Sequence, residues 1–225
     1  MKRSYQFCLS LLLLTKNSQR PMVNMLLALS SMPRIKHVVE LSLSPFFQYS
    51  YSAMTKVLTR WKCSRESLLI FVLRWLGSPN ELSNGKKFYS FIHDFTKLSK
   101  PHSECLKNRS YHVTNNPIGG RRQLSGGYDF ACLTYDSGQG GHCPIVDCLR
   151  LEGDENHLSV ARQQIECLMK HLNLSSELVL IKVDSNYGRI AFLHTAYQHD
   201  NMLILSRLQS GINLYKPYEG EHKRG

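Results

Sequence analysis

The sequence lacks the features that mark membrane-spanning and secreted proteins. A transmembrane helix requires about 20 apolar residues in succession, and no stretch of this sequence is that long. The leucine run Leu11–Leu14 is far too short. Lys2 and Arg3 precede an apolar stretch over residues 7–14, as in a signal peptide, but no A-x-A cleavage site follows. We therefore expect residues 7–14 to begin an amphipathic or buried helix, and we expect no membrane partner.

The cysteines also lack a recognisable framework. There are seven, an odd number, without a C-x-x-C pair, which argues against a set of disulfides and for a reducing compartment. His142, Cys143 and Cys148 match no common spacing of zinc ligands, and Cys148 falls inside an alternating, strand-like segment. A structural role for these side chains is therefore the favoured interpretation, and the chain is expected to be cytoplasmic.

Acidic residues are scarce relative to basic ones. The formal net charge is +11 and the pI is about 9.4, which favours an anionic partner such as nucleic acid. Residues 1–85 carry 11 Lys and Arg against 3 acids, residues 86–122 carry 8 against 2, and residues 123–225 carry 9 against 12. A polyanion is therefore expected to contact the first 122 residues. The alternative is that the scattered basic residues of the N-terminal stretch only keep the protein soluble.

Residues 1–85 are predicted to form a basic, all-α region. After Pro21, apolar residues recur at the spacing of one helix face: Met22, Met25, Leu26 and Leu29. Further helices are predicted over Ser52–Trp61 and from a possible N-cap, Ser64, to Trp75, before Gly77–Pro79 ends the run. Direct DNA contact and a packing or homodimerisation role are both open for this region.

From residue 86 to residue 225 the pattern predicts a second, α/β domain. Helices are predicted over Leu158–Leu172, with Asn156 as a cap, and over Arg189–Gln198. The predicted strands are Phe88–His93, Tyr128–Tyr135, Ile145–Leu151, Leu178–Val183 and Met202–Leu208. The order β-β-β-α-β-α-β predicts a mixed sheet with helices on its faces. It resembles the ribonuclease H-like (RNase H-like) fold, which implies acidic residues on the first strand and just after the fourth, two neighbouring central strands.

Asp94 and Asp184 occupy those two places. Each follows a predicted strand, and the carboxyl ends of strands are where open α/β sheets bind ligands. Phosphodiester cleavage can use two divalent ions about 3.5–4 Å apart, and Mg²⁺ or Mn²⁺ prefers carboxylate oxygens. We therefore expect both aspartates to be catalytic and to bind two such ions. The alternative is that each begins a turn or caps a helix, which would suit Asp184 before Ser185-Asn-Tyr-Gly188.

Further motifs, taken in their order along the chain, resemble the bacterial insertion-sequence transposases of the DDE class. After Asp94 come Thr96, Pro101, Arg109, Tyr111, His112, a Gly-rich basic turn Pro117–Arg122 and Gly126–Tyr128; after Asp184 come Tyr187 and Gly188; and Arg207–Pro217 follows the last strand. The resemblance implies metal-dependent DNA strand cleavage and transfer at the terminal repeats of a mobile element. It implies double-stranded DNA as partner, no small-molecule substrate, and a nucleoid-associated location in a bacterium. The residues expected to contact DNA are Lys97, Lys100, Arg109, Arg121, Arg122 and Arg207.

The resemblance also implies a third acidic residue, a Glu, on a helix downstream of the fifth strand. Glu219 and Glu221 follow Pro217 in a polar tail without an apolar helical pattern, and Gln209 replaces an arginine of the family's motif. We therefore expect a C-terminally truncated, incomplete or inactive transposase, whose sheet exposes apolar surface for want of its last helix.

Two alternatives remain open. The first is a non-enzymatic DNA-binding protein derived from the same fold. The second is a different nuclease of that fold, such as a resolvase, in which Asp147 or Asp129 would supply the extra acidic residue.

Overall fold

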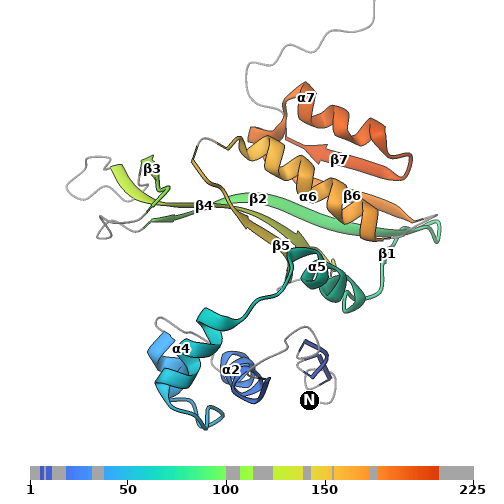
Figure 1. Cartoon of the computed structure of the whole chain (residues 1–225). Coiled ribbons are helices and arrows are strands. Elements are labelled where there is room, and N and C mark those ends of the chain that lie inside the picture. The colour runs from blue at the N-terminus through green and yellow to red at the C-terminus, as the bar shows by residue number, and fades with distance from the viewer. Residues whose placement is uncertain are drawn as a thin grey trace, which may run out of the picture. The chain divides into compact units, whose positions relative to one another are not determined.

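The chain divides into two compact units, Met1–Gly77 and Ser78–Gly225. Their elements are drawn in Figure 1, a computed structural model that describes residues 6–7, 9–11, 19–31, 38–99, 107–113, 124–138, 143–153, 155–172 and 177–207. The division falls at the predicted stop Gly77–Pro79 and not at residue 85, because strand β1 (Asn80–Glu81) already pairs with β2 (Lys87–Ser99).

The first unit is built from helices over its described residues. These are α2 (Gln19–Ser31), α3 (Val38–Ser42), α4 (Tyr51–Arg60) and α5 (Arg65–Arg74). Ser64 is the N-cap of α5, as predicted, since its hydroxyl accepts a hydrogen bond from the Ser67 amide at 3.1 Å. The core of the helices consists of Met22, Met25, Ala28, Leu41, Phe47, Met54 and Val57. No helix in the described part of the chain is long and apolar enough to cross a membrane.

The second unit is an α/β structure with a mixed, seven-stranded sheet, which confirms the predicted fold class at this level. Besides β1 and β2, the strands are β3 (Ser110–Val113), β4 (Leu124–Tyr135), β5 (Ile145–Arg150), β6 (Leu178–Val183) and β7 (Met202–Ser206). The path through the sheet is β3-β4-β2-β6-β7, with β5 also pairing with β4. β2 pairs antiparallel with β4 and parallel with β6, and β6 pairs parallel with β7.

The two faces of the sheet differ in burial. On one face Phe91, Leu133 and Ile181 are fully buried, and helix α6 (His157–Leu172) contributes Ile165 and Leu168 to the same core. On the other face Leu203 and Leu205 are 54% and 59% exposed. We call these the covered face and the open face. Figure 1 shows α6 lying along the strands, with α7 (Ile190–Leu193) near β7. The expected exposed apolar surface lies on the open face.

Strand β2 is longer than predicted and does not end at His93. Its parallel pairing with β6 ends at His93 opposite Val183, but its antiparallel pairing with β4 continues to Ser99 opposite Gly127. Gly127 permits that approach, because a Cβ at this position would overlap the Leu98 carbonyl oxygen. Asp94 is therefore the first residue of β2 beyond its ladder with β6.

The remaining differences concern short elements. Neither β1 nor β3 was predicted, and the predicted helix Arg189–Gln198 is split into α7 and the 3₁₀-helix η2 (His194–Gln198). Strand β6 and helix α6 lie where the apolar run and the helical periodicity placed them.

Candidate functional site

Asp94 and Asp184, ninety positions apart in the sequence, line one cavity. Because His93 and Val183 are directly paired in the parallel β2–β6 ladder, the residues that follow them leave the ladder at the same end of the sheet. The cavity measures about 430 Å³. Its lining consists of the two aspartates together with Phe95, Lys97, His157, Asn186 and Arg189. The fold therefore brings the two predicted carboxylates together.

Asp184 is held by the turn that follows β6. Its Oδ1 accepts a hydrogen bond from the Asn186 amide at 2.9 Å, and its Oδ2 accepts one from Asn186 Nδ2 at 2.8 Å. It thus caps the 3₁₀-helix η1 (Ser185–Tyr187), which is the structural role that the sequence also suggested. Ser206 Oγ, from β7, donates to the Asp184 carbonyl oxygen at 3.1 Å. The cap holds the Asp184 carboxylate at the cavity.

A chain of buried polar side chains runs beneath the cavity. Tyr187, His93 and Gln164 are at most 1% exposed and Asp147 is 7% exposed. His93 Nδ1 lies 3.1 Å from the Tyr187 hydroxyl, and His93 Nε2 lies 2.8 Å from Gln164 Oε1. Gln164 Nε2 donates to Asp147 Oδ2 at 3.1 Å and to the Ala131 carbonyl at 3.2 Å. The chain joins η1, β2, α6 and β5.

The hydrogen bonds assign a direction to this chain. Gln164 Oε1 can only accept, so His93 must carry its proton on Nε2, and Nδ1 then accepts from the Tyr187 hydroxyl. Burial lowers the pKa of His93, which agrees with a neutral imidazole. The hydrogen bonds of the series therefore all run in one direction, from the Tyr187 hydroxyl as first donor to the Asp147 carboxylate as last acceptor. We call these four side chains the buried relay, as a name for the hydrogen-bonded series alone.

Tyr187 connects the buried relay to the two carboxylates. Burial raises the pKa of its hydroxyl, and the negative charges of Asp94 and Asp184 raise that pKa further. Both carboxylates thus act on one hydroxyl group.

His157 is a site residue that the sequence reasoning missed. It is half-buried at the start of α6, and its ring lies 5.5 Å from the rings of both Phe95 and Tyr187. Burial lowers its pKa, the nearby Arg189 cation lowers it further, and Asp184 opposes them. Its position follows from the strand directions. Strand β5 runs parallel to β2, so a helix that follows β5 must begin at the sheet end that holds Asp94.

The predicted DNA-contacting residues are only partly at this cavity. Lys97 lines it, and Arg207 directly follows Ser206, which pairs with Val183 at the same sheet end. Arg109 lies elsewhere, beside β3, where its guanidinium donates to the Tyr111 hydroxyl at 2.8 Å and lies 5.1 Å from that ring. Lys100, Arg121 and Arg122 lie outside the described residues, as do Glu219 and Glu221.

Asp147 and Asp129 do not join the two carboxylates in the cavity lining. Asp94 is paired with Cys132, whereas Asp147 is paired with Leu133, the next residue, so Asp147 and Asp94 lie on opposite faces of the sheet. Asp129 is paired with Lys97 on the covered face. The resolvase-like alternative, in which Asp147 or Asp129 supplies the extra acidic residue, stays a prediction.

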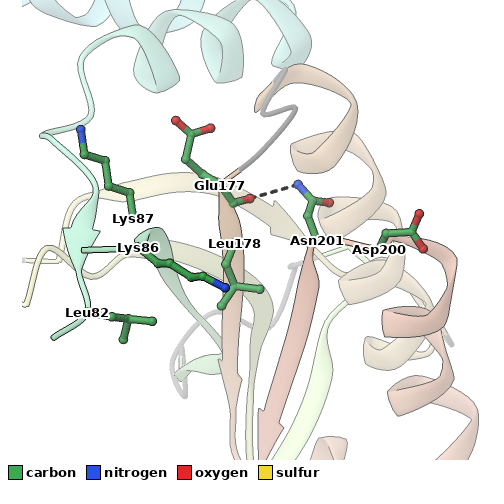
Figure 2. Close-up of a pocket in the computed structure, with 7 residues that line it drawn as sticks. All are labelled: Leu82, Lys86, Lys87, Glu177, Leu178, Asp200 and Asn201. Atoms are coloured by element: carbon green, nitrogen blue, oxygen red, sulfur yellow. Dashed lines mark hydrogen bonds between the residues drawn. The ribbon is translucent and has the colours of Figure 1, made fainter. Parts of the chain in front are cut away.

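A second, larger cavity of about 520 Å³ lies at the opposite end of β2 and β6. Figure 2 shows its lining, which combines cationic and anionic side chains: Leu82, Lys86, Lys87, Glu177, Leu178, Asp200 and Asn201. The dashed line marks the Asn201 Nδ2 hydrogen bond to the Glu177 carbonyl oxygen, 3.1 Å long. No sequence pattern singled out this end of the sheet.

The residues at the first cavity offer part of a metal site. Two carboxylates supply hard oxygen ligands, and Mg²⁺ commonly takes one or two protein carboxylates and keeps several waters. Within the described ranges, however, no group of three or more His, Cys, Asp or Glu side chains is placed to hold a metal ion. Comparison with known proteins adds no further ligand, since no protein-family model matches the chain. No curated protein matches it either.

Proposed function

We propose that this chain is a transposase-derived protein with an RNase H-like core, whose Asp94 and Asp184 bind divalent metal ions for DNA strand cleavage and transfer. The observation that carries the proposal is the shared cavity of these two carboxylates, at the sheet end where β2 leaves its ladder with β6. The element order and the adjacency of β2 and β6 in the mixed sheet support the RNase H-like assignment.

The side chains at the cavity would have different roles in this reaction. Asp94 and Asp184 would hold Mg²⁺ or Mn²⁺, which when bound activates a water or a 3′-hydroxyl and stabilises charge on the leaving oxygen. Lys97 lines the same cavity and carries the positive charge that a DNA phosphate requires. The cap made by Asn186 holds the Asp184 carboxylate in a fixed orientation.

The alternative is a DNA-binding protein of the same fold without cleavage activity. It is favoured by the lining of the cavity in the described part of the chain, where Asp94 and Asp184 are the acidic residues and no third one joins them. Two carboxylates fix metal ions less well than three, and a small misplacement of the reacting groups lowers the rate strongly. We therefore propose weak or absent cleavage by this chain alone.

The test uses the full chain with supercoiled plasmid DNA and Mn²⁺, and measures nicking and DNA binding in parallel. Nicking that is lost in both Asp94→Asn and Asp184→Asn, with DNA binding retained, would support the enzymatic proposal. Salt-sensitive binding without nicking would support the alternative, with log affinity falling by about 0.9 per neutralised phosphate for each log unit of salt. A chain that neither nicks nor binds DNA would overturn both.

A further inference from the structure

Two cysteines on neighbouring strands face each other on the open face of the sheet. Cys132 of β4 and Cys148 of β5 are directly paired in the antiparallel ladder, and their sulfur atoms lie 3.3 Å apart. Both are free thiols. The sequence alone did not show this pairing, because the two residues belong to different predicted strands and form no C-x-x-C motif.

The backbone geometry at this pair suits a disulfide. Directly opposed residues of antiparallel strands have Cα atoms about 4.5–5.5 Å apart. Disulfides join Cα atoms about 4.4–6.8 Å apart, with a sulfur–sulfur bond of about 2.05 Å. The two sulfur atoms therefore need to approach by only a little more than 1 Å, which side-chain rotation can supply. The ladder shifts register one pair further on, between Leu133 and Thr134, where strand spacing can adjust.

The pair is also accessible. Cys148 is exposed and Cys132 is half-buried, and both lie on the face that carries the exposed leucines of β7. Among the other cysteines that the structure describes, none lies opposite a second cysteine in a strand pair, and Cys63 donates to the Ser64 carbonyl oxygen. Cys143 is exposed but precedes β5, and Cys167 is half-buried on α6. Cys132 and Cys148 thus each face a second thiol, and the pair can be reached from solvent.

We propose that Cys132 and Cys148 form a redox-reactive dithiol, which closes to an intramolecular disulfide when it meets a low-molecular-weight disulfide of the glutathione class. This inference does not depend on the proposed transposase function. The bond would fasten β5 to β4 beside Asp94, since Asp94 is the β2 residue paired with Cys132.

The reaction takes two thiol–disulfide exchanges. The Cys148 thiolate attacks one sulfur of the small disulfide, whose S–S bond breaks, and one small thiolate leaves and takes up a proton. Cys132, losing its proton to solvent, then attacks the Cys148 sulfur of the mixed disulfide and releases the second small thiolate, which is protonated in turn. The two protein thiols lose two electrons and two protons, and the small disulfide is reduced to two thiols.

The experiment exposes the full, folded chain to oxidised glutathione, blocks remaining thiols by alkylation, and maps disulfide-linked peptides by mass spectrometry. The expected product in the unmodified chain is a Cys132–Cys148 cross-link with the mass loss of two hydrogen atoms. Cys132→Ser is expected to stop at a stable glutathione adduct on Cys148, because the resolving thiol is gone. Cys143→Ser, the matched control, is expected to cross-link as the unmodified chain does.

Other outcomes would overturn the proposal. These are separate glutathione adducts on Cys132 and Cys148 in the unmodified chain, or both thiols remaining free while Cys143 reacts. Each is read from the unmodified chain, so the conclusion does not require that a variant fold.

Discussion

The two ends of the sheet carry cavities of similar size but different construction. At the end with Asp94 and Asp184, the smaller cavity lies over the buried relay of Tyr187, His93, Gln164 and Asp147. At the opposite end, the larger cavity is lined by charges of both signs, and the hydrogen bond that joins its lining residues runs from Asn201 to the Glu177 carbonyl.

The two cavities differ less in volume than in how the residues around them are held. A buried polar group is costly unless it is hydrogen-bonded, so a series of four such groups is maintained only by close positioning of several elements. At the opposite end Lys86, Lys87 and Asp200 are exposed, and exposed charges contribute little to stability. We therefore expect substitutions in the buried relay to lower stability more than substitutions in the lining of the second cavity.

The largest expected effect follows from removing the centre of the buried relay. Gln164→Leu would leave the buried His93 Nε2–H without its acceptor and would also remove the amide that donates to Asp147, so we expect a loss of about 1–3 kcal/mol for the unsatisfied donor alone. Asn201→Ala, the control at the opposite cavity, should cost about 0.5–1.5 kcal/mol. Urea denaturation measures both. Equal free energies of unfolding for the two variants would remove the distinction between the two ends.

Acidification should lower the stability of the protein through His93, which belongs to the buried relay. The pKa of buried His93 is lowered by folding, so the folded state binds fewer protons than the unfolded state below the normal histidine pKa. The stability contributed by neutral His93 is therefore present above about pH 6.5 and is lost as the pH falls towards the lower, folded-state pKa. Urea midpoints from pH 7.5 to 5 should fall, and less steeply in His93→Gln. A slope unchanged in that variant would mean that another group, such as His157, carries the effect.

The smallest effect is expected at a half-buried ion pair on the open face. Lys182 Nζ lies 2.6 Å from Asp136 Oδ2, and this hydrogen bond is the main reason why the pKa of Asp136 is lowered. Lys182 is 38% exposed in its side chain, so Asp136→Asn should cost less than about 1 kcal/mol at neutral pH. Because the carboxylate's contribution is lost as the pH falls through its lowered pKa, the variant should show a weaker decline below about pH 4. A loss as large as that of Gln164→Leu would contradict this ranking.

The sequence predicted those parts of the structure that have local signals. The apolar run of β6, the periodicity of α6 and the Ser64 cap each depend on neighbouring residues, and each was placed correctly. Asp94 and Asp184 were paired through a resemblance that also fixed the strand order. The extension of β2 to Ser99 depends on pairing with β4, which no local pattern reveals.

The buried relay escaped prediction for a similar reason. Gln164 interrupts the apolar face of α6, and His93 stands at the end of an apolar strand, so each alone resembles an ordinary polar residue. The hydrogen bonds between them form only when α6 packs on the covered face, because this brings the Gln164 amide to His93 and Asp147. His157 is similar, since its place at the cavity depends on the direction of β5.

The most direct test of the proposed metal site is a Mn²⁺ titration of the full chain, with free Mn²⁺ followed by electron paramagnetic resonance. We predict that the unmodified chain and Asp200→Asn, a control at the opposite cavity, bind Mn²⁺ equally. Asp94→Asn and Asp184→Asn should each bind at least about tenfold more weakly, the equivalent of about 1.4 kcal/mol for one lost ligand. Equal binding by all four proteins, or a loss confined to Asp200→Asn, would contradict a metal site at Asp94 and Asp184.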